Sequence, residues 1–156
     1  MIKGKIYKLD QYEKMIVELS ANAKSELDLN IVGFGGEFIF ARENNLYPDF
    51  KIHNTSKELK TDLYDANWMG HSVDVKVNRN KNNPLMVPEY ANTDCKIFAL
   101  FTVNYPKYTF EGFTLNSIIF QKKNLKKTRV MSYVLEKNQL LDLKELIFLL
   151  ELWKNI

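Results

Sequence analysis

Cysteine, glycine and proline are scarce in this chain, whose 156 residues include one cysteine, six glycines and four prolines. A single cysteine excludes an intrachain disulfide framework and is typical of a reducing compartment. No apolar run approaches the roughly 18–20 residues of a membrane-spanning helix, and the first residues lack the sustained apolar stretch of a signal peptide. We therefore expect a soluble, cytoplasmic protein with no membrane partner.

Several chemical motifs are also missing. The chain has no glycine-rich loop ending in Lys-Ser or Lys-Thr and no Gly-x-Ser-x-Gly, so NTPase and serine-hydrolase functions lack support. Cys95 has no Cys or His at metal-ligand spacing, which argues against a zinc site. The hydrophobic content, 46%, is sufficient for one sizeable core, so residues 1–156 are expected to form a single domain.

Hydrophobic periodicity predicts an α/β fold with a mixed β-sheet flanked by helices. Asp10 followed by Glu13 has the spacing of a capping box and opens a predicted helix, while Asn138 is the expected cap of the last helix. The continuously apolar run 97–103 is typical of a central buried strand. The predicted helices are 10–27, 31–44 and the segment after Asn138, and the predicted strands are 7–8, 85–87, 97–103, 108–113, 130–135 and a hairpin at 63–77.

The most informative segment is the predicted strand Val73-Asp74-Val75-Lys76-Val77. Alternation places the three valines on one face and Asp74 with Lys76 on the other. If Met69-Gly70 is a two-residue turn, Asp65 falls opposite Asp74, with Cβ atoms roughly 4.5–5.5 Å apart. Two carboxylates at so short a distance repel each other, which favours a divalent cation between them.

The pattern acid-x-Lys alone is weak evidence, because it occurs five times, beginning at Asp49, Glu58, Asp74, Asp94 and Asp142. Only Asp74 combines a strand, a tight turn and an upstream acid. The alternative is an exposed hairpin with a surface ion pair.

Glu37 is a second unusual acid, because it lies in a predicted helix among glycines and phenylalanines. A carboxylate in such surroundings needs a partner, a metal or a raised pKa. The alternative is an acid at the helix N-terminus that interacts with the dipole. The nearby glycines, each costing about 1 kcal/mol in a helix, predict a close backbone approach.

The chain contains, in order, a Gly-rich run ending in Glu37, then Asp65, then Asp74-Val75-Lys76 and an apolar strand. This order resembles the PD-(D/E)xK nuclease superfamily, with its restriction-endonuclease-like fold. The resemblance covers residues 31 to about 120 and is closest to small nuclease-like proteins of phages and other viruses. Tyr64 stands where the motif has proline, so the choice between Asp65 and Asp62 stays open.

This resemblance implies a metal-dependent deoxyribonuclease, endonuclease or exonuclease, that hydrolyses DNA phosphodiester bonds with Mg²⁺ or Mn²⁺. Asp65 and Asp74 would be metal ligands together with the backbone carbonyl of Val75. Lys76 would position the attacking water, and Glu37 would support the metal site. For a viral protein the compartment would be the host cytoplasm. The alternative is a catalytically inactive nucleic-acid-binding or viral interaction module on the same fold.

Two acid-free basic clusters are expected to contact DNA. Arg79 and Lys81 follow Lys76 closely among four asparagines, and a second cluster begins with Lys122 and Lys123. Such side chains can contact phosphate oxygens, although a solvated loop is the alternative for the second cluster. The net charge of +3 adds little by itself. A homodimer is expected if the substrate is a branched DNA junction.

Overall fold

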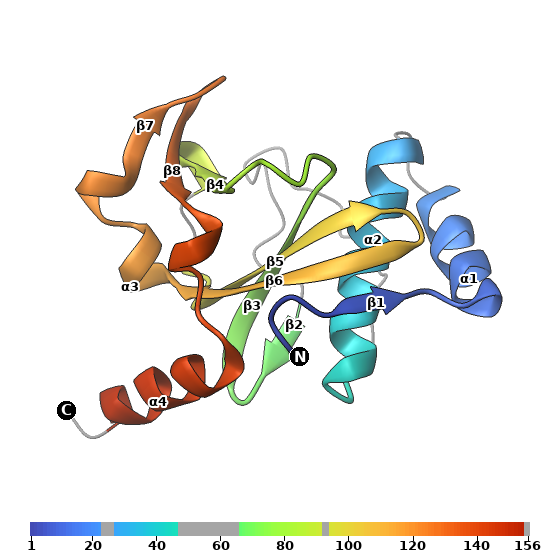
Figure 1. Ribbon diagram of the computed structural model, residues 1–156, viewed down its shortest axis with the longest axis horizontal. Helices are drawn as coiled ribbons and strands as arrows, with labels where there is room; N and C mark the ends of the chain where they lie inside the picture. The colour runs from blue at the N-terminus through green and yellow to red at the C-terminus, as the bar shows by residue number, and fades with distance from the viewer. Residues whose placement is uncertain (23–26, 47–65, 92–93, 155–156) are drawn as a thin grey trace.

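The larger of two β-sheets forms the centre of the protein. The structure, a computed structural model, describes residues 1–22, 27–46, 66–91 and 94–154. The larger sheet has the strand order β1-β6-β5-β3-β2. Within it β3 and β5 are parallel, and the other neighbours are antiparallel (Figure 1). The strands are β1 (Ile6–Lys8), β2 (Ala66–Trp68), β3 (His71–Asn78), β5 (Ile97–Asn104) and β6 (Lys107–Leu115).

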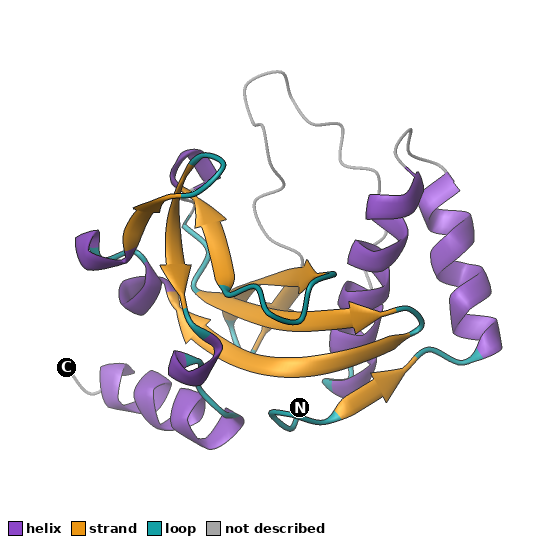
Figure 2. Cartoon of the chain, turned by 45° about the horizontal axis from the view of Figure 1, so that its top comes forward, coloured by secondary structure: helices purple, strands orange, loops and turns teal. Residues whose placement is uncertain are grey.

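A smaller antiparallel sheet, with the order β4-β8-β7, forms a separate layer at one end of the molecule (Figure 2). Its strands are β4 (Leu85–Pro88), β7 (Leu125–Lys127) and β8 (Met131–Leu135). Short helical segments connect the two sheets, namely η1 (Glu89–Ala91), α3 (Asn116–Ile119) and η2 (Lys122–Asn124), and η3 (Lys137–Gln139) follows β8. The α/β class and the mixed sheet predicted from the sequence are therefore confirmed.

Three longer helices pack around the larger sheet: α1 (Gln11–Asn22), α2 (Leu27–Glu43) and α4 (Leu143–Lys154). Helix α2 packs against both α1 and β3, whereas α4 packs against β6 at the other end of the sheet (Figure 1). None of the helices within the described ranges is long and apolar enough to cross a membrane.

The predicted capping box at the start of α1 is confirmed. The Glu13 amide donates to Asp10 Oδ1 at 2.7 Å, and the Asp10 amide donates to Glu13 Oε1 at 2.9 Å. The predicted last helix is present, but its predicted cap, Asn138, is wrong, because residues 137–139 form a 3-10 turn and α4 begins at Leu143. Asp142 is its capping residue, since the Glu145 amide donates to Asp142 Oδ1 at 2.8 Å.

Strand β5 separates two apolar clusters, as expected of a central buried strand. Ile97, Ala99 and Phe101 point into the larger cluster, which also contains side chains from α1, α2 and α4. Phe98 and Leu100 point into the smaller cluster, which lies between the two sheets. Both faces of β5 are thus buried, and the side chains of the adjacent strand β3 are divided between the same two layers.

Candidate functional site

The β2–β3 hairpin has the turn and register that the sequence predicts. Met69 and Gly70 both have positive φ, 53° and 77°, as in a type I′ turn, and Trp68 pairs with His71. Asn67 and Ala66 then pair with Ser72 and Val73. This is the register on which the predicted opposition of Asp65 and Asp74 rests. Asp65 itself, like Asp62, lies outside the described residues.

Asp74 and Lys76 form an ion pair on one face of β3. Lys76 Nζ lies 2.9 Å from Asp74 Oδ2, and the two side chains are 34% and 16% exposed. The valines at 73 and 75 are buried in the larger cluster, on the opposite face, which confirms the predicted alternation. Because Phe98 and Leu100 of the parallel strand β5 pair with Asp74 and Lys76, the ion pair borders the smaller apolar cluster.

Helix α2, which carries Glu37, packs directly against β3. A Cβ placed on Gly36 would lie 2.5 Å from Val77 Cγ2 and 3.6 Å from Val75 Cγ1, so the helix backbone touches the strand. The close approach predicted from the glycines is confirmed. Glu37 is half-buried and lies well inside α2, so the alternative of an acid at the helix N-terminus is wrong. Helix α2, which carries Glu37, contacts the valine face of β3, whereas Asp74 projects from the opposite face of this strand.

Four further polar side chains, which no local sequence pattern links, lie on this part of the sheet: Asn78, Thr102, Glu111 and Lys137. Thr102 Oγ1 donates to Glu111 Oε1 at 2.8 Å, and Lys137 Nζ lies 3.3 Å from Thr102 Oγ1 and 3.4 Å from Glu111 Oε1. Thr102 pairs with Asn78 across β3 and β5. This polar group therefore extends the face that carries Asp74 and Lys76.

The loop after β3 presents the first predicted basic cluster, and its shape depends on its own asparagines. Asn78 Nδ2 donates to the Pro84 carbonyl at 2.9 Å, and the Asn82 amide donates to Asn80 Oδ1 at 2.9 Å. Lys137 Nζ also donates to the Lys81 carbonyl. Arg79 and Lys81 are exposed on this loop. At least two asparagines thus shape the loop by internal hydrogen bonds.

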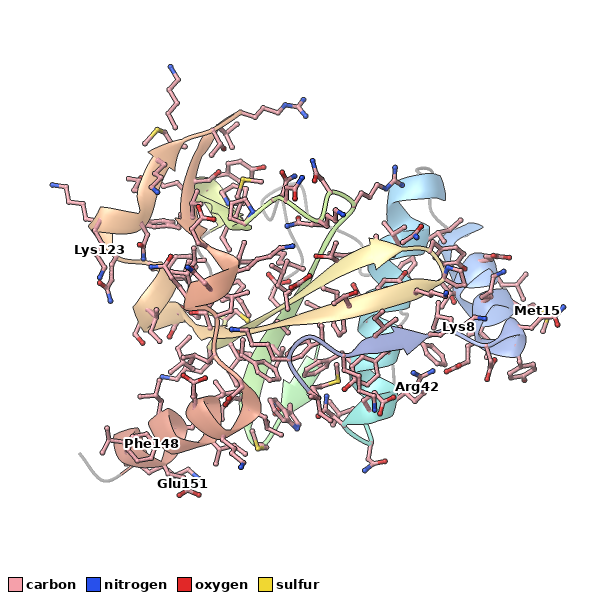
Figure 3. All side chains as sticks on the ribbon, viewed as in Figure 1. Lys8, Met15, Arg42, Lys123, Phe148 and Glu151 are labelled. Atoms are coloured by element: carbon pink, nitrogen blue, oxygen red, sulfur yellow. The ribbon has the colours of Figure 1, made fainter. Side chains whose placement is uncertain are left out.

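Lys122 and Lys123, predicted to contact DNA, lie in a different layer. Both are exposed on η2, which leads into β7 of the smaller sheet. Figure 3 shows Lys123 at the outer edge of that layer, far from α1 and its labelled Met15. The predicted basic residues therefore lie in two separate places, the loop beside β3 and the segment that leads into the smaller sheet.

The predicted metal ligands are only partly described. Asp74 and the backbone of Val75 are adjacent on β3, whereas Asp65 falls outside the described ranges. Within residues 1–22, 27–46, 66–91 and 94–154, no three His, Cys, Asp or Glu side chains gather in a way that could hold a metal ion. Asp74 offers the carboxylate oxygens that Mg²⁺ and Mn²⁺ prefer.

His71 begins β3, at the turn of the hairpin. Partial burial lowers the pKa of its imidazole, and the nearby charges of Lys96 and Lys154 lower this pKa further. Its ring is therefore mainly neutral near pH 7, because the ordinary value is about 6.5.

No protein-family model, no curated protein and no solved structure matches this chain.

Proposed function

We propose that the protein is a metal-dependent nuclease that hydrolyses DNA phosphodiester bonds on a restriction-endonuclease-like core. The observation that carries this proposal is the Asp74–Lys76 pair, 2.9 Å apart and partly shielded from water on a strand beside the centre of the sheet. The connectivity around the pair supports it, since β2 and β3 form a tight hairpin and β5 returns parallel to β3.

Asp74 would hold Mg²⁺ or Mn²⁺ together with Asp65 and the carbonyl of Val75. When bound, such a cation neutralises charge on the phosphate and on the departing oxygen. The donor chemistry of Asp74 fits a hard cation, because its carboxylate lies on the polar face of β3 and its side chain remains 16% exposed. Glu37 is not part of this proposed ligand set, because its helix packs against the opposite, valine face of β3.

Lys76 would orient the attacking water. Its ammonium lies 2.9 Å from the Asp74 carboxylate, so Lys76 would be next to any cation that Asp74 holds. The lysine could then donate to the water or to a phosphate oxygen. Positioning of this kind accelerates a reaction because the reactants meet in one geometry.

Arg79 and Lys81 would contact the DNA backbone beside the site. They are exposed on the loop that follows Lys76 by three and five residues, and this loop is held in place by Asn78 and Lys137. A preformed loop loses less conformational entropy on binding than a flexible one.

A catalytically inactive nucleic-acid-binding or viral interaction module is the second candidate function, and the same ion pair favours it. Asp74 and Lys76 already satisfy each other at 2.9 Å, as a structural ion pair would. Such a module would bind DNA through the basic surfaces and would not cleave it.

Cleavage of plasmid and of branched, duplex and single-stranded DNA with and without Mg²⁺ separates the two functions. Asp74→Asn and Lys76→Ala should each abolish most metal-dependent cleavage. Asp94→Asn is the matched control, because Asp94 also precedes a lysine by two residues but is exposed outside the strand. Equal single-turnover rates for Lys76→Ala and wild type would refute the role of Lys76, and wild-type binding without any cleavage would refute the nuclease assignment.

The choice between the two upstream acids needs its own comparison. Asp65→Asn should eliminate activity and Asp62→Asn should not, because the Trp68–His71 register, if continued by one more pair beyond Ala66–Val73, would bring Asp65 and not Asp62 opposite Asp74. The reverse result would mean that the second ligand is Asp62.

A further inference from the structure

The β7–β8 hairpin and the turn of helix before it form a strongly basic surface, which we call the basic hairpin (residues 122–135). Between Glu111 and Glu136 the chain has five lysines and arginines and no acid. All five are exposed: Lys122, Lys123, Lys126, Lys127 and Arg129. Segment η1 packs on β8 and adds one exposed acid, Glu89, so the surface keeps a clear excess of positive charge.

The turn of the basic hairpin is held by side-chain hydrogen bonds. Thr128 Oγ1 donates to the Val130 carbonyl at 2.8 Å, and the Thr128 amide contacts the same carbonyl at 3.1 Å. Ser132, which is almost fully buried, lies 3.3 Å from Thr128 Oγ1 and donates to the Val130 carbonyl at 3.2 Å. Arg129 is therefore presented by a turn with a defined shape, which reduces the entropy lost on binding.

Two apolar side chains accompany the cations at the turn. Val130 is 42% exposed and Met131 is 41% exposed, although both lie beside charged residues. The hairpin lies in the smaller sheet, at the end of the molecule opposite α1 (Figures 1 and 2). A basic, projecting ribbon with an apolar tip is thus available to a partner.

We propose that the basic hairpin grips duplex DNA, with Lys126, Lys127 and Arg129 on the phosphates and with Val130 and Met131 in a groove. This inference rests on the proposed function in taking DNA as the ligand, and it assigns the duplex-binding surface to a layer separate from Asp74 and Lys76. A two-stranded ribbon fits the major groove, which is about 12 Å wide.

A duplex fits this surface better than an anionic membrane does. Cations occur on η2, on β7 and in the turn, so they are spread along the ribbon as phosphates are along a groove. The exposed apolar area, by contrast, comes from two half-exposed side chains, which is small for anchoring in a bilayer.

Binding of a fluorescent 20-base-pair duplex, measured by anisotropy in chelator, tests the proposal without requiring catalysis. The triple variant Lys126→Ala, Lys127→Ala, Arg129→Ala should bind about two orders of magnitude more weakly at 0.1 M salt, and its salt slope should fall by about 2 to 3. The control triple Lys8→Ala, Lys107→Ala, Lys144→Ala removes the same charge from other elements and should change binding little. Figure 3 shows Lys8 at the opposite end of the molecule from Lys123.

The outcomes separate this inference from the nuclease proposal. Weaker duplex binding by the hairpin triple alone supports the inference even if wild type cleaves nothing. Unchanged duplex binding by a hairpin triple with a wild-type melting temperature overturns it, even if Asp74→Asn abolishes cleavage. Equal losses of duplex binding in both triples would reflect net charge and would also overturn the inference. So would a hairpin triple that binds the duplex like wild type but no longer binds the phosphatidylserine vesicles that wild type binds.

Discussion

Two glycines of α2 provide a sharp test of how this helix meets the sheet. A Cβ on Gly33 would meet no described atom within 4 Å, whereas a Cβ on Gly35 would lie 2.0 Å from Tyr108 Oη and 2.7 Å from its Cζ. Real Cβ atoms do not tolerate such distances, so Tyr108 or the helix must move. The same substitution, glycine to alanine, should therefore have opposite effects two residues apart.

The magnitudes follow from helix propensity and packing. Gly33→Ala should stabilise the protein by about 1 kcal/mol, because alanine is the better helix former. Gly35→Ala gains the same propensity but overpacks a fully buried tyrosine, at a cost of about 1–3 kcal/mol. It also disturbs the hydrogen bond that Tyr108 Oη donates to the Val32 carbonyl at 2.8 Å, which contributes about 1 kcal/mol. The net effect is a destabilisation of about 1–3 kcal/mol.

Thermal melts of both variants measure the difference. In a protein of this size, 1 kcal/mol shifts the Tm by about 2–4 °C, so Gly33→Ala should melt higher than wild type and Gly35→Ala about 2–12 °C lower. Tyr108→Phe removes the oxygen nearest the added methyl, so in the Gly35→Ala background it should cost less stability than in wild type. Equal Tm shifts for the two alanine variants would refute the close contact of α2 with Tyr108.

The hairpin was predictable from the sequence because local rules determine it. The Met69-Gly70 turn sets the register, and alternation then assigns Asp74 and Lys76 to one face. The start of α1 was likewise predictable, since both members of its capping box are within four residues. By contrast, Asp142 superseded Asn138 as the cap of α4, because residues 137–139 make a 3-10 turn that positions Lys137 over the sheet.

The polar group of Thr102, Glu111 and Lys137 could not be predicted from local patterns, because its members come from three separate segments. Thr102 is a polar residue in the otherwise apolar run 97–103, which was the available signal. Glu111, however, faces Thr102 only because the β5–β6 register shifts at Leu100 and Phe101. The second sheet was missed for a similar reason: Lys126 and Lys127 have low strand propensity, and pairing with β8 makes β7 a strand.

Three polar contacts outside the glycine-rich interface give further expectations. Arg42→Ala should lower the free energy of unfolding by about 1–2 kcal/mol in urea titrations, because it leaves the largely buried Glu13 carboxylate without the guanidinium at 2.7 Å; an unchanged urea midpoint would contradict this. Lys137→Met should speed trypsin cleavage in loop 79–83, since Lys137 Nζ donates to a carbonyl of that loop; an unaltered cleavage rate would show that other contacts hold it. His71 predicts a pH dependence. Burial lowers its pKa below the ordinary value of about 6.5, so the unfolded chain takes up the proton first as the pH falls. Wild type should therefore lose stability, relative to His71→Asn, as the pH falls from 8 through 6.5 to the lowered pKa of the folded state. Below that pKa the difference in unfolding free energy between the two proteins should stay constant. Urea unfolding of both proteins between pH 8 and 5 measures this, and parallel stability curves would mean that the imidazole titrates alike in the folded and unfolded states.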